Sequence, residues 1–177
     1  MTLLPHPDRP GMTVNCAVIT VSDTRTPETD RSGQLIKQLL QEKGHAIAAY
    51  KILKDEPAQI KALLPELCSR PDLDALILNG GTGIAPRDTT YDAIQSLLEK
   101  QLPGFGELFR AASFQEIGSR AIASRACAGV YQSKIIFSIP GSTGAVKLAL
   151  EHLILPEIVH LVSVISDPYP DASAAIP

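Results

Sequence analysis

The chain has 177 residues and a formal net charge of −3, and 45% of its residues are hydrophobic. This length fits one domain with a full core, and the weak negative charge gives no reason to expect a nucleic-acid partner. Apolar runs of membrane-spanning length are interrupted by charged residues or proline, so no membrane partner is expected.

The three cysteines, Cys16, Cys68 and Cys127, lie far apart in the sequence. Their odd number argues against a disulfide framework, and no pair has the spacing of metal ligands. Buried, reduced thiols are the expected state, which fits a cytoplasmic protein. Residues 1–12 contain several prolines but no apolar segment typical of a signal peptide, so we expect a flexible arm there.

Apolar runs and helical periodicity alternate along the rest of the chain. In chain order they predict a strand at 14–21, a helix at 32–43, a strand at 46–53, a helix at 57–67, a strand at 74–79, helices at 91–98 and 104–117, a strand at 134–139, and helices at 145–155 and 156–165. Residues 119–128 are small and polar and receive no element. The alternation predicts one α/β domain at residues 13–166, with a mainly parallel sheet covered on both sides. Residues 167–177 are expected to form a loose tail.

Three polar clusters directly follow predicted strands. They are, in chain order, Ser22 and Asp23, then residues 79–88, then Pro140, Gly141 and Ser142. Ligands bind beyond the carboxyl ends of the strands in open α/β sheets. We therefore interpret the three clusters as parts of one site.

The central cluster combines glycines with two charged residues. It contains Gly80, Gly81, Thr82 and Gly83, followed by Arg87 and Asp88. Such glycines let backbone N–H groups approach phosphate oxygens, Arg87 could bind an anion, and Asp88 could hold Mg²⁺ with substrate phosphates. The alternative is a tight turn in which Asp88 or Thr89 caps the next helix. The lysine and hydroxyl residue that end a P-loop are absent.

For several further polar residues the sequence allows both a binding role and a purely structural role. The pair Asp55 and Glu56, just before Pro57, could form only a turn and a helix N-cap, or could reach a metal from the carboxyl end of a strand. Ser142 could face an anion with the N-terminus of the last helical region, or it could only cap that helix. Arg120 and Arg125 could bind phosphate or face solvent.

Five segments, in this order, resemble the MoaB/Mog family of molybdenum cofactor biosynthesis proteins, and its MoaB branch in particular. They are TVSDTR at 20–25, ILNGGTGIAPRDTTYDA at 77–93, GFGELFR at 104–110, SRAIASRACAG at 119–129 and FSIPGSTGAVKLALE at 137–151. The resemblance covers about residues 13–165. It implies a three-layer α/β/α sandwich that assembles as a homotrimer, or as a homohexamer of two trimers.

The resemblance also implies a ligand and a reaction. The terminal phosphate of molybdopterin would attack the α-phosphate of ATP in the presence of Mg²⁺, pyrophosphate would leave, and the adenylylated product would pass to the molybdate-insertion enzyme. By position, Asp55 and Asp88 match acids of the family that serve as catalytic and Mg²⁺-binding residues. The glycine loop matches as well, and Ser119, Gly141 and Ser142 match loops that contact the pterin.

Two departures from the family pattern bear on activity. Adenylylating relatives often have proline where this chain has Tyr91 and Thr143, whereas Asp55, Arg87 and Asp88 are intact. An active site is therefore favoured over a molybdopterin-binding oligomer without ATP turnover. A related domain of a longer protein is disfavoured by the chain's length, and a flavodoxin-like module is disfavoured by the poor phosphate loop after the first strand.

Overall fold

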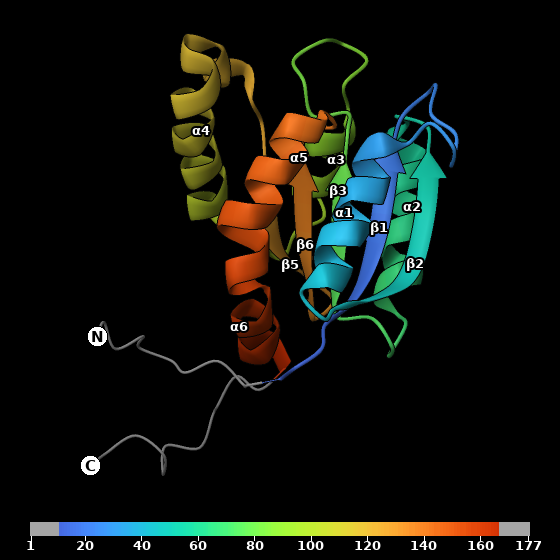
Figure 1. The fold of residues 1–177 in the computed structure, drawn as a ribbon. Helices are drawn as coiled ribbons and strands as arrows, with labels where there is room; N and C mark the ends of the chain where they lie inside the picture. The colour runs from blue at the N-terminus through green and yellow to red at the C-terminus, as the bar shows by residue number, and fades with distance from the viewer. Residues whose placement is uncertain (1–10, 167–177) are drawn as a thin grey trace, which may run out of the picture.

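The computed structural model describes residues 11–166, which form three layers: a six-stranded sheet with helices on both faces (Figure 1). This confirms the predicted α/β/α sandwich. The predicted tail and most of the predicted arm lie outside the described residues, so the domain limits at residues 12 and 167 remain a prediction. Met12, expected to belong to the arm, packs against the core, and its Sδ accepts a hydrogen bond from Ser163 Oγ at 3.5 Å.

The four strands expected from the sequence form the parallel part of the sheet. They are β1 (Asn15–Val21), β2 (Ala46–Leu53), β3 (Ala75–Asn79) and β6 (Lys134–Ile139). β1 pairs with β2 and β3, and β3 pairs with β6, in the sheet order β2-β1-β3-β6-β5-β4. All residues of β3 are buried, as is typical of a parallel strand covered on both faces.

Two further strands were not predicted, and they make the sheet mixed. β5 (Cys127–Tyr131) pairs antiparallel with β6, and β4 (Lys100–Gln101) pairs antiparallel with β5. The β5–β6 turn places Gln132 and Ser133 at φ 46° and 59°. Positive φ at both central residues is typical of a two-residue hairpin turn that usually contains Asn-Gly. This turn has Gln-Ser in place of Asn-Gly, so the sequence does not predict the hairpin or β5.

The helices cover both faces of the sheet. They are α1 (Arg31–Glu42), α2 (Pro57–Cys68), α3 (Thr90–Gln95), α4 (Pro103–Ile117), α5 (Thr143–Ala149) and α6 (Leu155–Ser166). α1, α4, α5 and α6 contribute to one hydrophobic core, and α2 and α3 contribute to the other. α3 ends three residues earlier than expected. Part of residues 119–128, for which no element was predicted, forms a 3-10 turn at Gly118–Ala123.

The last two predicted helices are joined without a break. A π-turn at Leu150–Ile154 connects α5 to α6, and the N–H of Leu155 donates to Leu150 O. Pro156 lacks an N–H and would clash in a regular helix, and such irregular turns accommodate that conflict. By length and composition the resulting helix, Thr143–Ser166, could cross a membrane, but a core helix passes the same test. Its residues Val146, Leu150 and Ile158 are fully buried in the first core.

The three cysteines are free and buried, as the sequence indicated. Burial raises the pKa of Cys16 to about 12 and those of Cys68 and Cys127 to about 11. A thiol with such a pKa stays protonated at neutral pH and is a poor nucleophile. The cysteines therefore behave as small core residues.

Candidate functional site

The three polar clusters meet at the carboxyl edge of the parallel strands, at the top of Figure 1. Gly80 N donates to Ile139 O at 3.0 Å, which joins the central cluster to the end of β6. A Cβ atom at Gly80 would overlap with Val21 O, and one at Gly141 would lie 3.0 Å from Gly80 Cα. Backbone from all three clusters is therefore packed at one place.

Asp55 lies beneath the glycine loop. Its side chain is buried, and Oδ1 accepts hydrogen bonds from Thr89 N at 3.2 Å, Thr89 Oγ1 at 2.8 Å and Thr90 Oγ1 at 3.1 Å. Gly81 has φ 61°, and a Cβ there would overlap with Asp55 Oδ2. The second carboxylate oxygen thus faces the backbone of the loop. Asp55 holds the end of the loop and is not the side-chain cap of α2.

Asp88 lies at the other end of the same loop. Its Oδ2 accepts a hydrogen bond from Ala85 N at 3.2 Å, and a Cβ at Gly83 would overlap with that oxygen. Residue 89 is the N-cap of α3, and it makes no side-chain cap bond. The alternative of a tight turn with Thr89 at the N-cap position is therefore observed, and the Asp88 carboxylate closes that turn. The role of Asp88 as a Mg²⁺ ligand remains a prediction.

Asp55 and Asp88 are the two candidate metal ligands beside the glycine loop. Asp55 and Asp88 each lie against a glycine of one short loop. Among residues 11–166, no three or more His, Cys, Asp or Glu side chains gather into a group that could hold a metal alone. Mg²⁺ is usually bound by one or two carboxylates together with substrate phosphates. Asp55 and Asp88 are therefore the carboxylates of the loop that could hold Mg²⁺ together with a substrate phosphate.

Arg87 and Asp23 form an exposed pair above Asp55. Arg87 Nε and Nη2 donate to the two carboxylate oxygens of Asp23 at 2.9 and 2.8 Å. These bonds lower the pKa of Asp23 below its ordinary value. Asp23 Oδ1 also accepts from Asp55 N at 3.3 Å. The first cluster is therefore tied to the glycine loop, while Ser22 Oγ closes its own turn by accepting from the N–H groups of residues 24 and 25.

The last cluster is fixed at both ends. Ser142 is the N-cap of α5, and its Oγ accepts from Ala145 N at 3.3 Å. Gly141 O accepts from Ser32 Oγ at 2.6 Å, which joins the turn after Pro140 to the start of α1. The capping interpretation of Ser142 is thus observed, and the N-terminal turn of α5 lies beside the glycine loop.

The sequence left open whether Arg125 binds phosphate or simply faces solvent, and in the structure it contacts the glycine loop. It braces the glycine loop, donating from Nε to Thr82 O at 2.9 Å and from Nη2 to Gly83 O at 2.7 Å. It also forms an ion pair with Asp92 at 3.0 Å and lies 4.5 Å from the ring centroid of Tyr91. Ser119 and Arg120 lie exposed in the 3-10 turn, and within residues 11–166 neither donates a hydrogen bond to the loop.

A buried network below the site was also missed. Asp30 Oδ2 accepts from Thr20 Oγ1 and from Tyr50 OH, both at 2.6 Å. Thr20 Oγ1 accepts from Asn79 Nδ2 at 2.9 Å, and Asn79 directly precedes the glycine loop. Asp30 is the N-cap of α1, where its Oδ1 accepts from Gly33 N at 2.9 Å. An aspartate directly before a helical pattern is a common N-cap, so the sequence could have indicated the capping role of Asp30. It could not have indicated the hydrogen-bonded connection from Asp30 to Asn79.

Comparison with known proteins identifies the family. Residues 17–160 match the family model described as "Probable molybdopterin binding domain". The chain belongs to this molybdopterin-binding family. Molybdenum cofactor biosynthesis protein B of Halalkalibacterium halodurans is 55% identical over 162 residues, covering 91% of this chain and 95% of that protein. The protein of the same name from Bacillus subtilis is 54% identical over 163 residues, covering 92% and 96%.

Solved structures of the molybdopterin-binding family share the architecture. A crystal structure of a molybdenum cofactor biosynthesis protein B matches with a TM-score of 0.86 at 47% identity, covering 88% of this chain and 97% of the other. The tungsten cofactor synthesizing protein MoaB from Pyrococcus furiosus matches with a TM-score of 0.75 at 38% identity, covering 85% and 95%. The resemblance to the MoaB/Mog family is therefore confirmed.

Proposed function

We propose that the protein acts in molybdenum cofactor biosynthesis, where it binds molybdopterin and adenylylates it with Mg²⁺ and ATP, releasing pyrophosphate. Membership of the molybdopterin-binding family and the names of its relatives support the general role. Adenylyl transfer is the finer proposal. The observation that carries it is the pair of carboxylates, Asp55 and Asp88, held against a glycine loop.

The site suits a transfer at phosphorus because such a reaction requires positioning and charge neutralisation more than a covalent nucleophile. Bound Mg²⁺ would neutralise phosphate charge, and Asp55 and Asp88 are the residues that would hold it. Arg87 would bind phosphate after leaving Asp23. That pair is exposed, and exposed ion pairs contribute little to stability, so the exchange is feasible.

The test is turnover by the purified protein with molybdopterin, ATP and Mg²⁺. Wild type is expected to release pyrophosphate, and Asp88→Asn to reduce the rate by about two orders of magnitude, as for loss of a charge-stabilising group. Asp72→Asn is the matched control, because Asp72 forms a surface ion pair with Arg70 and lies outside the glycine loop. If Asp88→Asn turned over like Asp72→Asn, Asp88 would have no part in the reaction.

A second candidate function is molybdopterin binding without ATP turnover. Tyr91 and Thr143, which stand where adenylylating relatives often have proline, favour it. Wild-type protein that binds molybdopterin but releases no pyrophosphate would establish this second function in place of the first.

We also propose self-assembly into a homotrimer or homohexamer, acting in the cytoplasm and passing product to the molybdate-insertion enzyme. Support for assembly comes from apolar side chains on and near α4. Leu108, Phe114, Ile117 and Ile122 are exposed by 50% or more. A groove of about 240 Å³ also runs between α4 and the last helices, lined by Phe105, Leu153 and Leu161 among others. Contiguous exposed apolar surface of this kind marks protein contacts.

A further inference from the structure

The buried network below the candidate site lies on one face of the sheet, near the ends of two neighbouring strands. Side chains alternate between the two faces of a strand, so Thr20 shares its face of β1 with Val18, and Asn79 shares its face of β3 with Ile77. Val18 and Ile77 belong to the first core, and Thr20 and Asn79 are register partners. The two polar side chains therefore meet in the interior, where each needs a hydrogen-bond partner.

Asp30 supplies the partner for Thr20. Its side chain is buried, and Oδ2 accepts from Thr20 Oγ1 and from Tyr50 OH at 2.6 Å each, while Oδ1 accepts from Gly33 N at 2.9 Å. A Cβ at Gly33 would overlap with Asp30 Oδ2, so the first turn of α1 packs directly on the carboxylate. Hydrogen bonds to a carboxylate are stronger than those between neutral groups. Asp30 is thus held by α1, and it orients the hydroxyl group of Thr20.

Thr20 connects Asp30 to the residue that precedes the glycine loop. Because the Thr20 hydroxyl donates its hydrogen to Asp30, Oγ1 is free to accept, and it accepts from Asn79 Nδ2 at 2.9 Å. The same Nδ2 also donates to Ile19 O, at the longer distance of 3.3 Å. Asn79 ends β3, and Gly80 follows with φ 106°, a region that favours glycine. Since glycine restricts the direction of the chain little, the loop needs a fixed residue where it begins.

We propose that Thr20 is a positioning residue, whose hydroxyl group, oriented by Asp30, holds the side chain of Asn79 and so fixes the start of the glycine loop. Arg125 braces the later part of the loop, and Thr20 acts at its beginning. The effect on reaction rate rests on the proposed function, whereas the effect on the loop does not.

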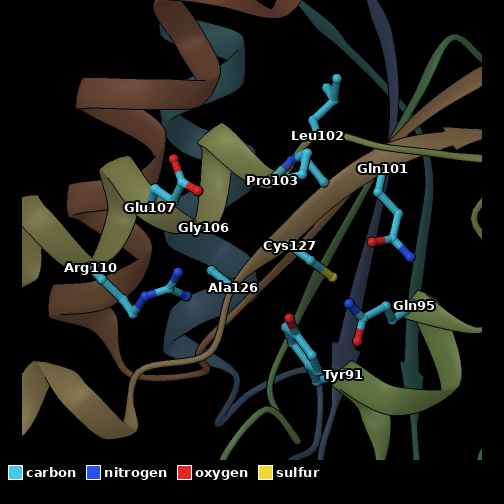
Figure 2. Close-up of a pocket in the computed structure, with 11 residues that line it drawn as sticks. Tyr91, Gln95, Gln101, Leu102, Pro103, Gly106, Glu107, Arg110, Ala126 and Cys127 are labelled. Atoms are coloured by element: carbon cyan, nitrogen blue, oxygen red, sulfur yellow. The ribbon is translucent and has the colours of Figure 1, made fainter.

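The network has no direct access to a ligand in the neighbouring pocket. Figure 2 shows that pocket, of about 140 Å³, beside Tyr91, and its lining comes from residues 91–110 and 126–128. Thr20, Asp30 and Asn79 are not among these residues, and each is 3% exposed or less. A change at Thr20 would therefore act through the loop and not through a lost contact in that pocket.

The first experiment measures hydrogen exchange at the amides of residues 80–82 in the full chain by NMR. Thr20→Val keeps the shape of the side chain but removes its hydroxyl, and it is expected to speed exchange about tenfold, the factor that corresponds to one lost hydrogen bond. Thr20→Ser keeps the hydroxyl and should exchange like wild type. Tyr50→Phe is the matched control, because it removes a bond to the same oxygen of Asp30 but leaves Asn79 attached.

Thermal unfolding of each variant verifies that it is folded. If Thr20→Val does not fold, Asp30→Asn takes its place. An amide nitrogen cannot accept the hydroxyl hydrogen of Thr20, while the amide oxygen can still accept from Gly33 N. The same acceleration of exchange at residues 80–82 is expected in this variant.

The second experiment measures pyrophosphate release with molybdopterin, ATP and Mg²⁺. Thr20→Val is expected to lower kcat about tenfold and to change the KM of either substrate little, because misplaced phosphates react slowly while the residues that contact the substrates are unchanged. Thr20→Ser should restore kcat. A role of the network in stability alone would affect Tyr50→Phe to the same extent.

Equal exchange at residues 80–82 in Thr20→Val and Tyr50→Phe would overturn the inference, and so would Thr20→Ser behaving like Thr20→Val. The exchange experiment contains neither molybdopterin nor ATP. If wild type released no pyrophosphate, the proposed adenylylation would fail, and exchange would still decide the role of Thr20.

Discussion

Gly81 shows how closely the candidate site is packed. It has φ 61°, in the left-handed region, and a Cβ there would overlap with both Asp55 Oδ2 and Thr90 Oγ1. Any side chain at this position must therefore displace a carboxylate that the proposed function needs, besides straining the backbone.

We expect Gly81→Ala to lower the free energy of unfolding by about 2 kcal/mol and to abolish pyrophosphate release. Gly104→Ala is the matched control. Gly104 lies in the first turn of α4 with no atom near its Cβ position, so alanine there should raise stability by about 0.5–1 kcal/mol. Urea denaturation of both variants measures the difference, and equal stabilities would contradict this account of the loop.

At the residue scale the sequence indicated which acids lie at the glycine loop better than it indicated the contacts that hold the loop. Asp55 and Asp88 follow strands or glycines, which is a local signal. Two of the partners of Arg125, the carbonyl groups of Thr82 and Gly83, lie more than 40 positions away, and no local pattern encodes that distance. Ser119 was singled out through the family resemblance, whereas in the same segment it is Arg125 that contacts the loop. The role proposed for Ser119 remains a prediction.

Arg125 connects two elements, the glycine loop and α3, and its contribution can be measured at that scale. We expect Arg125→Met to speed amide hydrogen exchange in residues 82–88 by about tenfold, since the brace on two carbonyl groups and the pair with Asp92 are lost. Arg120→Met should leave exchange unchanged, because Arg120 is exposed in the 3-10 turn. Unaltered exchange in the Arg125 variant would show that the loop is held by other contacts.

The elements themselves were predictable where their patterns are strong. All four parallel strands and the long helices follow apolar runs or helical spacing, and the structure has them within a few residues. The exceptions have physical causes. β5 is short and leads into a hairpin turn that lacks the usual Asn-Gly. The helix continues through Pro156 because a π-turn accommodates the hydrogen bond that proline cannot donate.

On the scale of the whole molecule, the exposed apolar surface of α4 predicts a self-associating protein. We expect Phe114→Glu to lower the molar mass measured by light scattering to that of a smaller species, because a charge in an apolar contact is costly to bury. Glu116→Gln, also exposed on α4, serves as the control and should leave the mass unchanged. A wild-type protein that is monomeric at all concentrations would contradict the proposed assembly.

The two borders of the sheet differ in length. β4, at one side of the sheet, has two residues, Lys100 and Gln101, whereas β2, at the other side, has eight. A long outer strand offers a row of free N–H and C=O groups to strands of other chains, while a very short, lysine-bearing one offers few. Aggregation by intermolecular strand pairing, during overexpression or heating, should therefore begin along β2.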